Sequence, residues 1–248
     1  MTPRLTTSDH AMIGRSGAGV RIAIVDSGIA AGHPHVGEVA DGVWIRPDGT
    51  SPDFADGIGH GTAVAGAVRD MAPAATLLAV RVFDRRLSTT ASVLARAIRW
   101  AAHEGRAQLI NLSLGTTNTR HEALLRDAVA DAQGAGALVM AAALDGELPC
   151  FPGALRGSAG GEGVVGVVLA TNCPRDALEL PGDALGATLA ASPYPRPIPG
   201  VPQGRNLSGV SFAVANATGL VARCLEGRAP VVSAAELLEL LRQEAASR

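Results

Sequence analysis

Aromatic side chains are scarce in this chain, at 3% of its 248 residues, and so are cysteines, of which there are three. Cys150, Cys173 and Cys224 are an odd number and lack the spacing of metal ligands, so we expect reduced thiols that fill the core, and no metal site. An excess of basic charge is also missing, because the formal net charge is −2. This balance excludes the electrostatic footprint of a protein that binds nucleic acid or acidic lipid.

Long hydrophobic runs are absent as well. The opening segment MTPRLTTSDHAMIGRSGAG contains no continuous apolar stretch of the kind found in secretory signals, and no later stretch is long and apolar enough to span a bilayer. We therefore expect a cytoplasmic protein without a membrane partner.

Small and aliphatic residues are abundant instead. The chain is 47% hydrophobic and contains 30 glycines. This content is enough for one large core at this length, so we expect residues 1–248 to form a single domain. Because few aromatic rings are present to fill space, the helices must pack closely on the sheet.

Apolar runs alternate with helical patterns along the chain. This alternation predicts an α/β fold with a parallel sheet and helices on both of its faces. The expected strands are residues 21–25, 76–82, 107–112, 137–142 and 164–170, and the expected helices are residues 62–69, 90–103, 119–134, 212–225 and 233–245.

Three short segments, in the order Asp, His, Ser, contain the residue types of a nucleophilic triad. Asp26 ends an apolar run, which places its carboxylate at the carboxyl end of a parallel strand, where ligands bind in α/β sheets. His60 lies between two glycines at an expected helix start. Ser211 opens a stretch of small residues, so its backbone N–H and the helix dipole could help to bind an oxyanion. A serine hydroxyl needs a histidine to take its proton and a carboxylate to orient that histidine, and this predicts a triad of Asp26, His60 and Ser211.

The three segments, IAIVDSGI, GHGTAVAG and SGVSFAVANATG, resemble those of the subtilisin-like serine proteases in order, flanking sequence and spacing. The resemblance runs from about Val20 to about Leu225 and implies the subtilisin-like fold. It also implies that Ser113, Leu114 and Gly115, which end QLINLSLG, pair with the substrate backbone and form a wall of the P1 pocket. Secreted relatives carry a folding pro-domain, for which the short segment before the first block leaves no room, so we expect folding without self-cleavage.

One departure from the family lies at the oxyanion hole. In the family, small alanines lead to Gly-Asn, and the asparagine side chain donates a hydrogen bond to the oxyanion; here LVMAAALDGE places Leu144 and Asp145 at those positions. An ionised carboxylate only accepts hydrogen bonds and would repel an oxyanion. Two alternatives stay open. Asp145 is protonated through burial and donates, which would raise activity at acidic pH, or it caps a turn with Gly146 and points away while the Ser211 backbone N–H or another donor suffices.

Leu144 adds a branched side chain where the family keeps a glycine. This predicts a narrower P1 pocket that favours small P1 residues, unless Leu144 turns inward and fills the core.

A second departure follows the histidine helix, where GTAVAGAVRDMAPAATLLAV passes to the next strand with no inserted loop. Many secreted relatives hold a calcium ion in that loop, so we expect no structural calcium at this place. The segment DFADGIG, residues 53–59, lacks a recognisable cation-binding spacing, and we expect a solvated turn there.

Two classes of function follow from these features. The resemblance implies an intracellular serine endopeptidase, and slow chemistry in a narrow pocket favours a restricted peptide or precursor peptide as substrate. The same acyl-enzyme could instead pass to an amine, giving peptide ligation or cyclisation. The rival class is a catalytically weak or inactive peptide-binding protein that keeps the fold; Asp145 favours it, whereas a complete triad argues against it. Neither class requires a cofactor.

Overall fold

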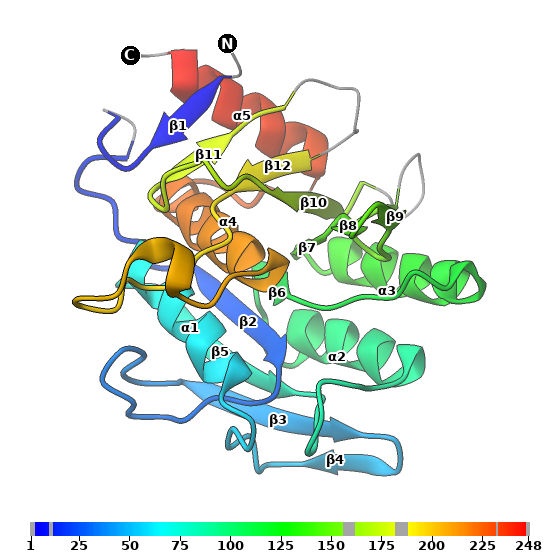
Figure 1. Ribbon diagram of the computed structural model, residues 1–248. Helices are drawn as coiled ribbons and strands as arrows, with labels where there is room; N and C mark the ends of the chain where they lie inside the picture. Colours follow the sequence, from blue (N-terminus) through cyan, green and yellow to red (C-terminus); the bar gives the residue numbers. More distant parts are fainter. Residues whose placement is uncertain (1–2, 10–11, 156–161, 182–187, 232, 247–248) are drawn as a thin grey trace.

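The computed structural model describes residues 3–9, 12–155, 162–181, 188–231 and 233–246. Within these residues the chain folds around a ten-stranded sheet with the strand order β1-β11-β12-β10-β7-β6-β2-β5-β3-β4 (Figure 1). Neighbouring strands from β3 to β12 pair in parallel. These strands are β3 (Asp41–Arg46), β5 (Thr76–Arg81), β2 (Arg21–Asp26), β6 (Leu109–Leu112), β7 (Leu138–Ala142), β10 (Val164–Leu169) and β12 (Thr188–Ala191).

Both edges of the sheet are antiparallel. The β4 strand (Gly49–Ser51) pairs with β3 at one edge, while β11 (Ala177–Glu179) and β1 (Arg4–Thr6) close the other edge. A separate two-stranded hairpin, β8 (Leu144–Asp145) and β9 (Leu148–Pro149), follows β7. The predicted parallel sheet is confirmed, with short antiparallel additions at its edges.

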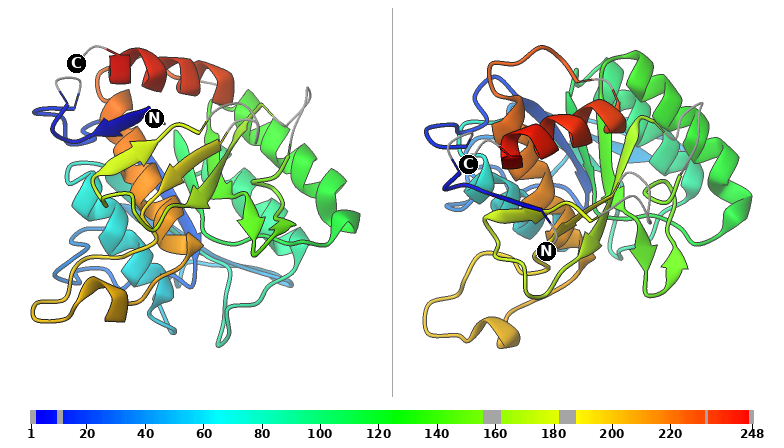
Figure 2. Two further views of the ribbon diagram at one scale, coloured as in Figure 1. Left: turned by 45° about the horizontal axis from the view of Figure 1, so that its top comes forward. Right: turned by 90° about the horizontal axis from the view of Figure 1, so that it is seen from above.

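Helices cover both faces of the sheet, as the alternating sequence pattern predicted (Figure 2). One apolar cluster packs α1, α4 and α5 against one face, and a second packs α2 and α3 against the other. The helices are α1 (His60–Met71), α2 (Ala91–His103), α3 (Glu122–Gly134), α4 (Val210–Leu225) and α5 (Ala234–Ala246), with 3₁₀ turns η1 (Thr119–His121) and η3 (Gln203–Arg205). No helix in the described ranges is long and apolar enough to cross a membrane.

The order of the strands creates a crevice at one edge of the sheet. The chain places β3 and β5 on one side of β2 and then crosses to β6, β7 and β10 on the other side. Ligands bind at such a switch point, outside the carboxyl ends of the strands. The helices α1 and α4 begin at this edge, α1 beside the end of β2 and α4 beside the end of β6 (Figure 1).

Candidate active site

Asp26 is the last residue of β2, and its side chain is 1% exposed. Its Oδ1 atom lies 2.7 Å from His60 Nδ1 and accepts a second hydrogen bond, also 2.7 Å, from the backbone N–H of Ser27. The chain leaves β2 sharply because Gly28 takes a φ of +101°. Asp26 therefore ends the strand with its carboxylate directed at the first residue of α1.

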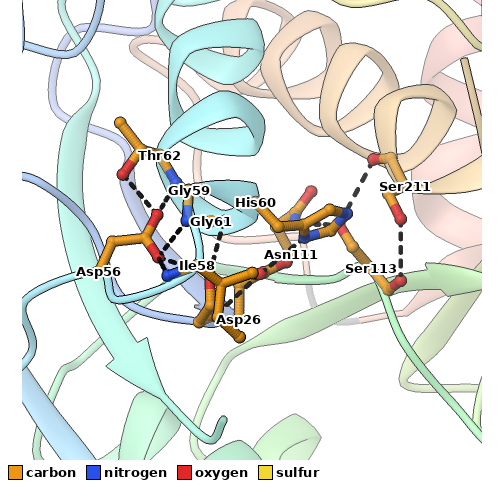
Figure 3. A network of polar contacts seen from close by, with 11 residues as sticks. Asp26, Asp56, Ile58, Gly59, His60, Gly61, Thr62, Asn111, Ser113 and Ser211 are labelled. Carbon is orange, nitrogen blue, oxygen red and sulfur yellow. Dashed lines mark hydrogen bonds and ion pairs between the residues drawn. The ribbon is translucent and has the colours of Figure 1, made fainter. Parts of the chain in front are cut away.

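His60 opens α1, and its ring lies between Asp26 and Ser211 (Figure 3). A carboxylate accepts only, so the Nδ1 atom of neutral His60 carries the proton and Nε2 keeps its lone pair. The hydrogen bond with Asp26 raises the pKa of His60 above its usual 6.5, against the opposing effect of burial, and the charges of Asp26 and Asp56 add to the rise. The arrangement suits a general base held in one tautomer.

Asp56 organises the start of α1. Its carboxylate accepts five hydrogen bonds: from the Ser27 hydroxyl, from the backbone N–H groups of Ile58, Gly59 and Thr62, and from the Thr62 hydroxyl (Figure 3). Burial opposes ionisation of this carboxyl, but these hydrogen bonds outweigh burial and lower the pKa of Asp56. The expectation of a solvated turn at residues 53–59 is therefore wrong for Asp56, because this carboxylate satisfies amide groups that the first turn of a helix leaves unpaired.

Ser211 is the second residue of α4, which Gly209 precedes without a side-chain cap. The Ser211 hydroxyl donates to the backbone carbonyl of Ser113 at 3.3 Å, and among the described residues it makes no hydrogen bond with His60. The triad is thus only partly assembled. Asp26 and His60 are hydrogen-bonded to each other, whereas Ser211 lines the pocket and its hydroxyl donates to the carbonyl of Ser113. Such a contact is commonly loose in an enzyme without substrate and tightens when substrate binds.

A buried polar chain ties α4 to the end of β6. Thr218 donates from its hydroxyl to Asn111 Oδ1 at 3.0 Å, and Asn111 Nδ2 donates to Ser113 Oγ at 2.9 Å. Ser113 Oγ in turn donates to the backbone carbonyl of Ser211 at 3.3 Å. Asn111 and Thr218 are fully buried, so these hydrogen bonds fix the position of Ser211 relative to Ser113.

A pocket of about 240 Å³ joins the predicted residues. A cavity of about 690 Å³ lies elsewhere, beside Arg69 and Asp70 near the end of α1, but its described lining includes no serine or cysteine. We place the site in the smaller pocket because the chemistry lies there. Its lining comprises Asp26, His60 and Ser211, the expected substrate wall Ser113, Leu114 and Gly115, the two departures Leu144 and Asp145, and also Phe83, Leu87, Ala142, Cys150 and Val210.

Leu144 and Asp145 form the β8 strand at the wall of this pocket. Leu144 is half-buried and lines the pocket, and it is not among the side chains of the core, so its inward-turned alternative is not the one adopted. Asp145 adjoins a turn at Gly146 and also lines the pocket, where its charge contributes to raising the pKa of the Cys150 thiol. Asp145 is exposed to solvent, and the burial that would favour a protonated carboxyl is missing.

Metal ligands do not gather in the part of the chain that the structure describes: no group of three or more His, Cys, Asp or Glu side chains could hold an ion there. Only four residues, Ala72 to Ala75, separate α1 from β5, so the connection is short.

The fold and the pocket define a parallel α/β protein in which an Asp-His pair faces a serine at the carboxyl edge of the sheet. The chain belongs to the subtilase family, whose model matches residues 17–163. That range includes Asp26, His60 and Asp145; Ser211 lies beyond it, so its assignment depends on the geometry of the pocket.

Among curated relatives, thermitase of Thermoactinomyces vulgaris is 39% identical over 137 residues, which are 51% of this chain and 48% of that protein. Subtilisin Savinase of Lederbergia lenta is 36% identical over 138 residues, 52% of this chain and 49% of that protein. The chain thus matches about half the length of these relatives.

Solved structures extend the comparison to nearly the whole chain. A cold-adapted subtilisin-like serine proteinase superposes with a TM-score of 0.69 at 22% identity, covering 91% of this chain and 82% of that one. Sphericase superposes with a TM-score of 0.67 at 24% identity, covering 90% and 82%. These likenesses establish the subtilisin-like fold.

Several residues of the site were not predicted from the sequence. Asp56 had a usable signal, because an acidic residue shortly before a helix start is a common cap. Asn111 also had one, since a polar side chain in the apolar run of β6 must find buried partners. Thr218 and Cys150 had none, because the fold alone brings them to Asn111 and to the pocket.

Proposed function

We propose that the chain is a serine endopeptidase that cleaves peptide bonds by acyl transfer through Ser211. His60 Nε2 takes the hydroxyl proton as Ser211 Oγ bonds to the scissile carbonyl carbon, and Asp26 stabilises the imidazolium that forms. The imidazolium then gives its proton to the departing amine, the C–N bond breaks, and water hydrolyses the acyl-enzyme by the same steps. The observation that carries the proposal is the 2.7 Å Asp26–His60 pair in one pocket with Ser211.

Stabilisation of the oxyanion is the weak part of this site. The Ser211 backbone N–H lies in the first turn of α4, where the helix dipole favours negative charge. The Asp145 carboxylate opposes it from the pocket wall. The proposal therefore includes slow hydrolysis, with a restricted peptide or precursor peptide as the substrate. It also includes a cytoplasmic location, with which the three buried free thiols agree because free thiols are typical of a reducing compartment. Transfer of the acyl group to an amine would use the same intermediate.

The test is covalent labelling of the purified protein with a fluorescent fluorophosphonate, which reacts with an activated serine. We expect labelling in the wild type and none in Ser211→Ala. If the two proteins label equally or not at all, the catalytic proposal fails.

The second candidate is a peptide-binding protein with the same fold. Two observations favour it: Asp145 lines the pocket, and the Ser211 hydroxyl donates to Ser113 and, among the described residues, not to His60. The Asp145→Asn variant separates the candidates. A large gain in hydrolysis identifies a slowed enzyme, whereas no gain together with an unreactive Ser211 identifies a binding protein. Glu147→Gln is the matched control, because Glu147 lies two residues away, is exposed and does not line the pocket.

A further inference from the structure

Asp145 is the carboxylate of the pocket that has no partner among the described residues. Of the described residues that line the pocket, Asp26, His60 and Asp145 carry acidic or basic side chains, and the first two are hydrogen-bonded to each other. Within the described parts of the chain the Asp145 carboxylate has neither a hydrogen bond nor an ion pair. Among the residues that the structure describes, no arginine lines the pocket, and the whole sequence contains no lysine. A bound substrate group would therefore meet an unneutralised negative charge.

The charge of Asp145 affects the pKa of another residue that lines the pocket. Cys150 also lines the pocket and is 5% exposed, and burial, together with the nearby Asp145 carboxylate, raises the pKa of its thiol to about 11. The Cys150 thiol is consequently neutral at physiological pH and adds no further negative charge. Two carboxylates therefore set the field of the pocket: Asp26, which is buried and hydrogen-bonded to His60, and Asp145, which is exposed.

The other walls are apolar and close together. Leu114 and Leu144 line the pocket with Phe83 and Leu87, and its volume of about 240 Å³ is below the range of about 300–1,000 Å³ typical of pockets for drug-sized ligands. Such walls disfavour bulky rings. A long unbranched side chain can lay its methylene groups along apolar walls and carry its charge to a polar partner.

We propose that Asp145 is a specificity-determining residue that selects substrates with a cationic P1 side chain, arginine or lysine. The inference rests on the proposed endopeptidase function and names its substrate class. It departs from the expectation of small P1 residues, because an unbranched cationic chain can lie along apolar walls that disfavour a ring. A substrate cation would also neutralise the Asp145 carboxylate. The substrate itself would thus reduce the repulsion between this carboxylate and the oxyanion that forms during acyl transfer.

The experiment compares two peptides that differ only in P1, arginine in one and citrulline in the other, because these side chains share shape and differ in charge. For wild type we expect kcat/KM to be at least about tenfold higher for the arginine peptide, a difference of about 1.4 kcal/mol. In Asp145→Asn the ratio should fall to near one, with the larger gain for the citrulline peptide. Glu147→Gln should keep the wild-type ratio.

The same pair of peptides is measured for binding to the Ser211→Ala protein by fluorescence anisotropy, so that the charge preference is read without turnover. We expect tighter binding of the arginine peptide, weakened by added salt and abolished in the Ser211→Ala, Asp145→Asn double variant. A ratio near one in wild type, or a preference that persists without Asp145, overturns the inference. Failure of the proposed function looks different: Ser211 does not label and neither peptide is cleaved, while the binding ratio still reports on Asp145.

An Asp145→Lys variant guards against a loss of charge preference that comes from altered folding. With its circular dichroism spectrum unchanged, it should bind the citrulline peptide better than the arginine peptide. An unchanged arginine preference in this variant would contradict the assignment.

Discussion

At the scale of single residues, His60 links catalysis to pH. A general base must be neutral, and the pKa of His60 is raised above 6.5 by the hydrogen bond with Asp26. The rate of fluorophosphonate labelling should therefore rise with pH, with a midpoint above 6.5, and Asp26→Asn should lower both the midpoint and the rate. The measurement is labelling rate from pH 5 to 9 for both proteins. A rate that is highest at acidic pH would contradict this and would support a protonated Asp145 instead.

The same raised pKa has the opposite consequence for folding stability. Because folded His60 binds its proton more tightly than the unfolded chain does, the pair with Asp26 contributes stability that is fully present below about pH 6.5. This contribution is lost as the pH rises through the folded pKa. The site thus gains reactivity over the pH range in which it loses part of its stability.

Asp56 provides a second prediction for one residue. Asp56→Ala removes five hydrogen bonds and leaves amide groups at the start of α1 unpaired, so we expect a loss of about 2 kcal/mol in the free energy of unfolding and a lower labelling rate. Urea denaturation and labelling measure the two effects. Its pKa is lowered in the fold, so its contribution is present above about pH 3.8 and is lost as the pH falls further.

Asp53→Asn is the control for this variant. Asp53 lies in the same loop, and its carboxylate is exposed, with a contact of 3.4 Å to Arg81. Exposed pairs of this kind contribute about 0–1 kcal/mol. If the Asp53 and Asp56 variants lose equal stability, the capping role of Asp56 is wrong.

At the scale of elements, the first turn of α1 is pressed against the end of β2. A Cβ atom at Gly61 would lie 2.2 Å from the carbonyl oxygen of Gly28 and 3.1 Å from Asp26 Cβ. We expect Gly61→Ala to cost about 2 kcal/mol of stability and to separate His60 from Asp26, which would lower the labelling rate. Thermal or urea unfolding, together with labelling, tests both effects.

The matched control lies one and a half turns further along the same helix. A Cβ atom at Gly66 would make only ordinary contacts, 3.6 Å from His35 Cβ, so Gly66→Ala should stabilise the protein by about 0.5–1 kcal/mol. Labelling should be unchanged in this variant. Equal effects of the two substitutions would show that α1 does not press on β2 as described.

The elements differ in how far the sequence predicts them. The β2 and β6 strands were predictable within two residues, because their side chains form short, almost fully buried apolar runs. The edge strand β1 was not predicted, because its pairing of residues 4–6 with residues 177–179 depends on chain segments far apart in sequence. The β8 hairpin was missed for a different reason: its two-residue strands carry too short a pattern to detect.

In the candidate site, too, local sequence patterns were predictive and contacts between distant segments were not. Each triad residue lies in a segment that predicts its position, at a strand end or a helix start. The contacts around them were not predictable, because Thr218 reaches Asn111 across 107 positions of the chain. The resting hydroxyl of Ser211 is also a property of the folded pocket and not of any segment.

At the scale of the whole molecule, the fold buries all three cysteines. Burial is the main cause that raises the pKa of Cys150 and Cys173 to about 11 and that of Cys224 to about 12. The unfolded chain ionises these thiols near pH 9, whereas the folded chain holds them neutral. Their contribution to stability is therefore present below pH 9 and is lost as the pH rises towards the folded values.

This burial makes the thiols a reporter of global unfolding. We expect a thiol reagent such as a dithionitrobenzoate to react slowly with the native protein at pH 8 and rapidly with all three cysteines in denaturant. The free energy of unfolding should also fall between pH 9 and pH 11, as read from urea denaturation at each pH. Rapid reaction of one thiol in the native state would mean that the fold opens locally around that cysteine without global unfolding. Assignment of that thiol to Cys150, by comparison with Cys150→Ala, would locate the opening at the pocket beside Ser211.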